Sequence, residues 1–210
     1  MKTKLALAQA TALFSAFCYI RGQGTFVYDQ QSFSSTIPPN ITYQIEANQP
    51  IGQSFTPTLS AVGFVQLELG DSVNLNGVGA TVYVNLRADS ITGPVLSSTE
   101  PVFMPDNFFG ATNFFFSSPI SVTPQTTYYF QPVVQSGDSW VVNTALGDDY
   151  PRGTMYYQGA VLRNFDFWFR GGLIVPEPSS TGLLLIGSGV LFYVRRMHLK
   201  RRCASRAGSP

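Results

Sequence analysis

Alternating apolar and polar residues mark the middle of this 210-residue chain as strand-forming. In residues 65–69 every second position is Val or Leu, and Gln66 and Glu68 lie between them. Residues 82–87 repeat the pattern, and the sequence Asn-Leu-Asn-Gly at 74–77 predicts a turn between the two segments. A period of two is that of a strand with one buried face. We therefore expect the two segments to form a half-buried antiparallel pair.

Further strands are predicted by runs rich in Val, Phe, Tyr and Thr that lie between clusters of Gly, Pro, Asn, Asp and Ser. These runs are residues 25–28, 41–45, 51–55, 95–98, 113–116, 126–130, 140–142 and 165–170. In the last run, phenylalanine at 165, 167 and 169 alternates with Asp166, Trp168 and Arg170. No segment between residues 25 and 175 combines helical periodicity with helix caps. The predicted fold class is therefore all-β, an antiparallel β-sandwich.

The first 24 residues have the pattern of a signal peptide. Lys2 and Lys4 form a basic start, and residues 5–20 are an apolar run rich in Ala and Leu. The sequence Gly-Gln-Gly at 22–24 supplies a cleavage site with small residues. We therefore expect export of the chain, with a mature protein that starts near Thr25.

The C-terminal region combines a proline-rich motif, an apolar stretch and a basic tail. The motif consists of Val175, Pro176, Glu177 and Pro178. Proline fixes φ and lacks a backbone donor, so the motif is expected to be extended. Residues 181–194 are uncharged and predict a single transmembrane helix, although typical spans have about 20 residues. Arg195 and Arg196 would stop this helix at the membrane and place the tail in the cytoplasm.

This order of motif, apolar helix and arginine cluster resembles the PEP-CTERM sorting signal of Gram-negative bacteria. The resemblance covers about the last 35 residues. It implies export, transient retention in the inner membrane, and recognition by an exosortase, a membrane protease-transpeptidase that acts at or near the motif. Such signals often accompany genes for exopolysaccharide and biofilm matrix. A permanent membrane anchor is the alternative, because anchoring requires only the apolar helix.

The order of several segments in the middle of the chain is similar to that in jelly-roll sandwich domains of secreted bacterial surface proteins. These segments are residues 53–57, 82–87 with 93–96, 126–130 and 165–169. The resemblance implies a jelly-roll-like sandwich and carries over no catalytic residue. The predicted parts are a signal peptide (1–24), an exported β-sandwich domain (25–172), a Pro-Glu-Pro linker with the sorting motif (173–180), a transmembrane helix (181–194) and a basic cytoplasmic tail (195–210).

Charge is distributed unevenly along the chain. The formal net charge of the whole chain is +1, but no lysine occurs between residues 25 and 175. That region has four arginines, at 87, 152, 163 and 170, against eleven Asp and Glu residues. Binding to nucleic acid requires clustered Lys and Arg that neutralise phosphates. We therefore expect no nucleic-acid partner.

Cysteine and histidine are confined to the two ends of the chain. The cysteines are Cys18 and Cys203, and the sole histidine is His198. Residues 25–175 therefore cannot form a Ser-His-Asp triad, a Cys-His pair or a metal site with His ligands. A glycosidase needs only two carboxylates, so the lack of His and Cys does not exclude this activity. No motif, however, marks two acidic residues as such a pair. We predict that the protein is not an enzyme and has no catalytic residue and no cofactor.

Aromatic residues of the exported region are candidates for stacking on sugar rings. The candidates are Trp140, Tyr150 and Trp168. Packing in the core is the alternative for aromatic residues on strands. Asp138, Asp148 and Asp149 have oxygen ligands that suit Ca²⁺, but Asp is also common in turns and the spacing is not that of an EF-hand. We predict no metal site, and bound Ca²⁺ is left open.

These patterns together predict an exported protein of the cell surface or extracellular matrix with a structural or interaction role. Its expected partners are an exosortase-type protease and, through the C-terminal helix, the membrane. Two alternatives are a carbohydrate-binding module for extracellular polysaccharide and a permanently membrane-anchored surface protein.

Overall fold

The computed structural model describes residues 24–32, 41–147 and 149–175. Residues Phe26–Ile174 form one compact unit of the chain. Every regular element among the described residues is a β-strand, and none of these residues forms a helix that could span a membrane. The predicted signal peptide, transmembrane helix and basic tail lie outside the described residues.

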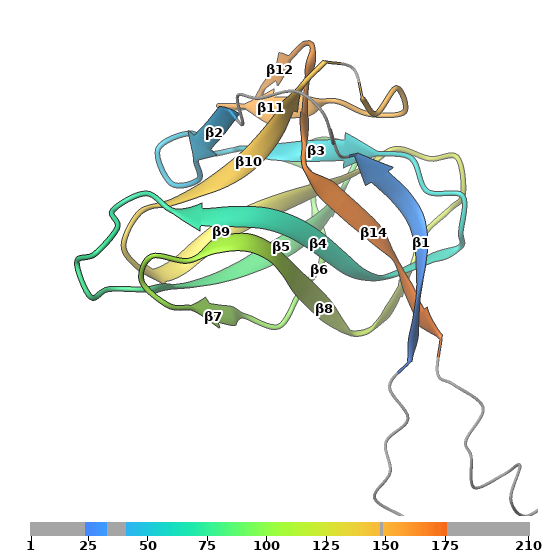
Figure 1. Ribbon diagram of the computed structural model, residues 1–210. Coiled ribbons are helices and arrows are strands. Elements are labelled where there is room, and N and C mark those ends of the chain that lie inside the picture. Colours follow the sequence, from blue (N-terminus) through green and yellow to red (C-terminus); the bar gives the residue numbers. More distant parts are fainter. Residues whose placement is uncertain (1–23, 33–40, 148, 176–210) are drawn as a thin grey trace, which may run out of the picture. The chain divides into compact units, whose positions relative to one another are not determined.

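The first sheet, sheet A, has seven strands (Figure 1). Its main order is β1 (Thr25–Ser32), β14 (Phe169–Val175), β4 (Ala61–Asp71), β10 (Trp140–Leu146) and β13 (Phe165–Phe167). In addition, β8 (Phe109–Ser121) pairs with β4, and β2 (Ile41–Gln44) pairs with β10.

The second sheet, sheet B, also has seven strands. Its main order is β12 (Ala160–Leu162), β11 (Met155–Tyr157), β3 (Gly52–Phe55), β9 (Tyr128–Gly137), β5 (Ala80–Ala88) and β6 (Val95–Ser98), with β7 (Val102–Met104) also paired to β5. The pairings with a defined register in both sheets are antiparallel. The prediction of an all-β, antiparallel, sandwich-like domain is confirmed for the described residues.

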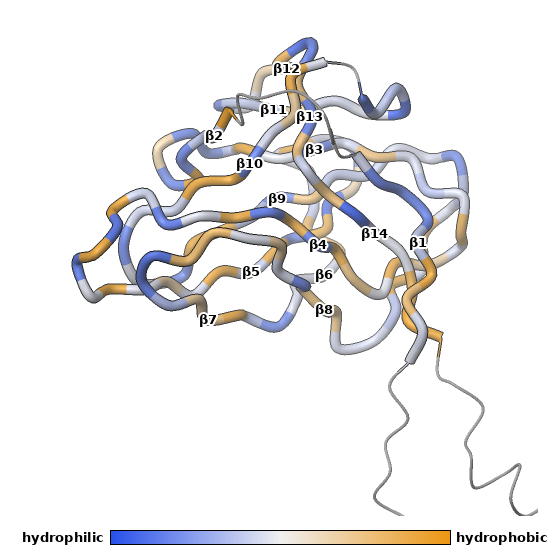
Figure 2. Tube along the Cα trace, viewed as in Figure 1, coloured by the Kyte–Doolittle hydropathy of each residue, from blue (hydrophilic) through white to orange (hydrophobic). Residues whose placement is uncertain are grey.

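The core contains the residues that the period of two assigns to the inner faces. Val65, Leu67 and Leu69 of β4 are at most 1% exposed. Val82, Val84 and Leu86 of β5 are 0% exposed. All of them belong to one cluster of buried side chains. Figure 2 shows apolar residues along these strands and polar residues in many of the loops between them.

The predicted pairing of residues 65–69 with 82–87 is wrong. β4 pairs with β8, β10 and β14 in sheet A, whereas β5 pairs with β6, β7 and β9 in sheet B. The turn between them therefore leads the chain from one sheet to the other. Two strands on facing sheets have the same inward pattern as two neighbours in one sheet, so the alternation identifies a buried face but not a partner.

The final predicted strand, residues 165–170, is divided into β13 and β14. The alternation holds for Phe167 and Phe169, which are 0% and 1% exposed. It fails at Asp166, which is 1% exposed although the pattern placed it on the outer face. Three short strands, β7, β11 and β12, are present where no strand was predicted.

Candidate functional site

β14 is the strand that leads into the Val-Pro-Glu-Pro motif, because its last residue is Val175. It pairs with β4 from Phe169, opposite Leu67, to Gly172, opposite Phe64. A Cβ atom at Gly172 would collide with the carbonyl oxygen of Val27 in β1. Glycine at this position therefore allows β1 to lie directly beside β14. β1 begins and β14 ends at the same end of sheet A (Figure 1).

Side-chain hydrogen bonds hold β1 against the rest of the sandwich. The carboxylate of Asp29 accepts hydrogen bonds from the backbone N–H groups of Thr58, at 2.9 Å, and Leu59, at 3.2 Å. The amide oxygen of Gln30 accepts a hydrogen bond of 2.5 Å from the Tyr150 hydroxyl. The first strand is thereby tied to segments that follow it by about 30 and 120 residues.

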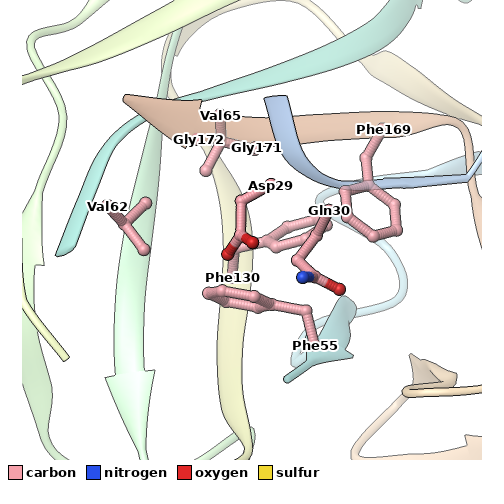
Figure 3. Close-up of a pocket in the computed structure, with 9 residues that line it drawn as sticks. All are labelled: Asp29, Gln30, Phe55, Val62, Val65, Phe130, Phe169, Gly171 and Gly172. Carbon is pink, nitrogen blue, oxygen red and sulfur yellow. The ribbon is translucent and has the colours of Figure 1, made fainter. Parts of the chain in front are cut away.

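A small cavity lies beside these two residues of β1. Figure 3 shows Asp29 and Gln30 close to the rings of Phe55, Phe130 and Phe169. Its volume of about 10 Å³ is at the lower limit for a single water molecule. The cavity is therefore a packing defect of the core and has no room for a substrate.

The buried carboxylate of Asp166 is bound by hydrogen-bond donors from other parts of the sandwich and has a structural role. Its Oδ1 accepts a hydrogen bond of 2.7 Å from Nε2 of Gln53, and its Oδ2 accepts one of 3.0 Å from the backbone N–H of Tyr150. The Gln53 side chain also accepts a hydrogen bond of 3.0 Å from the backbone N–H of Phe167. Gln53 belongs to sheet B and Phe167 to sheet A, so this network joins the two sheets.

The three predicted sugar-stacking residues do not share a surface. Trp140 is 0% exposed, and its indole Nε1 donates a hydrogen bond of 3.1 Å to Asp138. Tyr150 is 4% exposed, and burial raises the pKa of its hydroxyl. Trp168 is partly exposed. Only Trp168 of the three is therefore accessible to solvent.

The predicted turn at 74–77 is held by Asp106, a residue that no pattern in the sequence marks. Asp106 accepts hydrogen bonds from the backbone N–H groups of Leu75, at 3.0 Å, and Gly77, at 2.9 Å. The hydrogen bond from Gly77 is the main cause that lowers the pKa of this carboxyl. Such a contact is not visible in the sequence because the turn and Asp106 are about 30 residues apart.

The acidic residues considered for Ca²⁺ show no cluster of ligands. Asp138 accepts hydrogen bonds from Asn76 and Trp140, Asp149 is exposed, and Asp148 lies outside the described residues. Within residues 24–32, 41–147 and 149–175, no group of three or more His, Cys, Asp or Glu side chains is arranged to hold a metal ion.

The segment that begins at the end of β14 identifies the sorting signal that this chain carries. Residues 175–202 match the family model of the PEP-CTERM protein-sorting motif. This chain carries a PEP-CTERM sorting motif. The motif implies export with transit through the membrane of a Gram-negative bacterium, and processing by an exosortase, which is a membrane protease. Val175 of this motif is 48% exposed, and Pro176, Glu177, Pro178, Arg195 and Arg196 lie outside the described residues.

Comparisons with whole proteins add little to the PEP-CTERM match. No curated protein matches the chain. Among solved structures, the VP2 subviral particle of infectious bursal disease virus is similar over 84% of this chain, with 14% sequence identity and a TM-score of 0.24. The match covers 50% of the VP2 chain, so the present chain spans half the length of that protein.

Proposed function

We propose that this protein is a non-enzymatic component of the bacterial cell surface or extracellular matrix, delivered there by its PEP-CTERM motif. In this proposal the C-terminal helix holds the exported chain in the inner membrane until an exosortase cuts near Pro176, Glu177 and Pro178. The β-sandwich is the part that is delivered. The observation that carries the proposal is the match of residues 175–202 to the sorting motif.

The position of the motif supports cleavage without loss of the fold. All fourteen described strands end at or before Val175. A cut between residues 176 and 180 would therefore remove none of these described strands and none of the buried core residues that they contribute. The first three residues of the predicted linker, 173–175, are part of β14, so the motif follows the folded domain directly.

The chemistry of the domain supports a role other than catalysis. Residues 25–175 contain neither His nor Cys. Several carboxylates that a carboxylate-only enzyme would need are bound to backbone N–H groups instead. These are Asp29, Asp71, Asp106 and Asp166. A hydrogen-bonded structural carboxylate is poorly placed to act as a general acid or a nucleophile.

The proposal is tested by replacing Pro176, Glu177 and Pro178 together with alanine in the producing bacterium. We expect the wild-type protein in the surface or extracellular fraction at reduced mass, and the triple variant in the inner membrane at full mass. Replacement of the adjacent Ser179 and Ser180 with alanine is the matched control and should behave as the wild type. Surface delivery of the triple variant at the wild-type mass would contradict exosortase sorting.

The same experiment distinguishes exosortase sorting from the alternative of a permanent membrane anchor. A permanently anchored protein would remain in the inner membrane at full mass in the wild type as well as in the triple variant. Its retention depends on residues 181–194 alone, since an apolar span needs no adjacent proline motif.

A further inference from the structure

The outer face of sheet A, which is turned away from the core, carries aromatic and amide side chains. Since Val65, Leu67 and Leu69 of β4 point into the core, the intervening residues Phe64, Gln66 and Glu68 point outward. The strand register places Phe115 and Gly172 beside Phe64, and Asn113 and Arg170 beside Gln66. Aromatic side chains of β4 and β8 therefore lie in one row and amide side chains of the same strands in the next, with Gly172 and Arg170 of β14 beside them.

An aromatic cluster covers one part of this outer face. Phe64 is 0% exposed but does not belong to the core cluster. Its ring is covered by Phe26 at 4.9 Å, Tyr28 at 5.8 Å and Phe115 at 6.5 Å between ring centroids. These three covering rings are 36%, 46% and 37% exposed, respectively. The face therefore presents three partly exposed rings, of which Phe26 and Tyr28 stack on each other with ring centroids 6.2 Å apart.

Arg170 connects this cluster with Trp168. Its guanidinium carbon lies 5.4 Å from the ring centroid of Tyr28 and 5.2 Å from that of Trp168. These distances are those of cation–π contacts. Tyr28 and Trp168 are thus held near one guanidinium group, although they are 140 positions apart in the sequence.

Polar side chains with hydrogen-bonding capacity occupy the next part of the face. Nε2 of Gln66 donates a hydrogen bond of 2.9 Å to Asn113, and its Oε1 accepts none in the described structure. Nδ2 of Asn143 donates a hydrogen bond of 2.5 Å to Glu68. Oε1 of Gln66 and the side chain of Asn143 are buried within the face. Gln66, Glu68 and Asn113 are partly exposed, and their remaining donor and acceptor sites are those that a ligand hydroxyl can use.

We propose that this outer face binds a neutral, extended polysaccharide of β-linked pyranose units. The axial C–H groups of such sugars form a flat apolar face that packs on aromatic rings, and their equatorial hydroxyls form a polar rim. Tyr28 and Trp168 supply the rings, and the partly exposed Gln66 and Asn113 supply amide groups beside them. The inference rests on the proposed export, because such polysaccharide lies outside the cell.

Charge favours a neutral polysaccharide over anionic occupants of this face. Residues 25–175 contain eleven acidic residues, four arginines and no lysine. An anionic polysaccharide or an anionic lipid surface would be repelled by this excess of negative charge. A neutral glycan incurs no such cost.

The test uses the full-length chain purified in detergent, which needs no sorting or cleavage. Its migration is measured by affinity electrophoresis in gels that contain hydroxyethylcellulose, barley β-glucan or alginate. We expect retardation by the two neutral glucans, whereas any retardation by alginate through the basic tail should be the same in the wild type and in the two ring variants. Tyr28→Ala and Trp168→Ala should each weaken retention by about tenfold. Phe103→Ala, which removes a 67% exposed ring from β7 of sheet B, should leave retention unchanged.

Three outcomes would overturn the inference. One is the absence of retardation by both neutral glucans, and another is retention that Tyr28→Ala and Trp168→Ala leave unchanged while their melting temperatures match the wild type. The third is a concentration-dependent dimer, or binding to neutral vesicles, that these two variants abolish without any glucan binding. Because the assay does not depend on processing, each result is independent of whether the sorting motif is cleaved.

Discussion

At the scale of single residues, burial distinguishes side chains that have the same identity in the sequence. Phe130 is 1% exposed, and its ring lies 5.0 Å from Phe169 and 5.8 Å from Phe55. Phe103 is 67% exposed. We expect Phe130→Ala to lower the free energy of unfolding by about 3–5 kcal/mol, and Phe103→Ala to change it by about 0.5 kcal/mol or less. Denaturant unfolding of the two variants measures both, and equal losses would contradict the assignment of the core.

Asp106 gives a second prediction at this scale, concerning pH. Its pKa is lowered from the ordinary 3.8, mainly by the hydrogen bond from Gly77. A carboxyl with a lowered pKa in the folded state stabilises that state above its unfolded pKa, and this effect is lost as the pH falls through the folded pKa. Asp106→Asn should therefore lower the melting temperature at pH 6 and have a smaller effect below about pH 4. A difference that grows towards acidic pH would show that the carboxylate does not hold the turn.

At the scale of elements, one hydroxyl contributes to the attachment of β1 in addition to the hydrogen bonds of Asp29. The Tyr150 hydroxyl accepts a hydrogen bond of 3.0 Å from the backbone N–H of Thr56 and donates one to Gln30. Tyr150→Phe leaves both groups without this partner, and we expect a loss of about 1–3 kcal/mol in the free energy of unfolding. In a Gln30→Ala background the same change should cost less, since one of the two hydrogen bonds is already absent. Additive losses in this double-mutant cycle would argue against the coupling.

The elements also show how far local pattern determines the fold. Residues 65–69 and 82–87 have the inward faces that alternation predicts, because the period of two is a property of each strand alone. Their partners, β8 and β9, lie far along the chain, so pairing depends on contacts that no local pattern encodes. Asp166 is buried against the pattern because Gln53, from the other sheet, satisfies its carboxylate.

The sorting motif and the proposed binding face also differ in how far the sequence predicts them. The PEP-CTERM motif could be predicted because its parts are contiguous from Val175 onward. A binding face built from β1, β4, β8 and β14 could not, since its residues come together only in the folded sheet. Of the three aromatic residues chosen from the sequence, only Trp168 lies on that face, because Trp140 and Tyr150 fill the core.

At the scale of the whole molecule, the sequence of described strands ends where the sorting motif begins. β14 pairs with β4, a central strand of sheet A, and β1 lies on its other side. The strand before the motif is therefore held on both sides by hydrogen-bonded neighbours. Removal of the segment after residue 180 should leave the melting temperature of the β-sandwich unchanged within about 2 °C, as differential scanning calorimetry of the processed and full-length chains would show.

The most direct measurement is the intact mass of the protein isolated from the producing bacterium, with its C-terminal peptide mapped. We expect a chain that begins near Thr25 and ends between Pro176 and Ser180, either free or linked to another group. A mature protein that still contains residues 195–210 would contradict processing at the PEP-CTERM motif. In that case the C-terminal helix would be a permanent anchor.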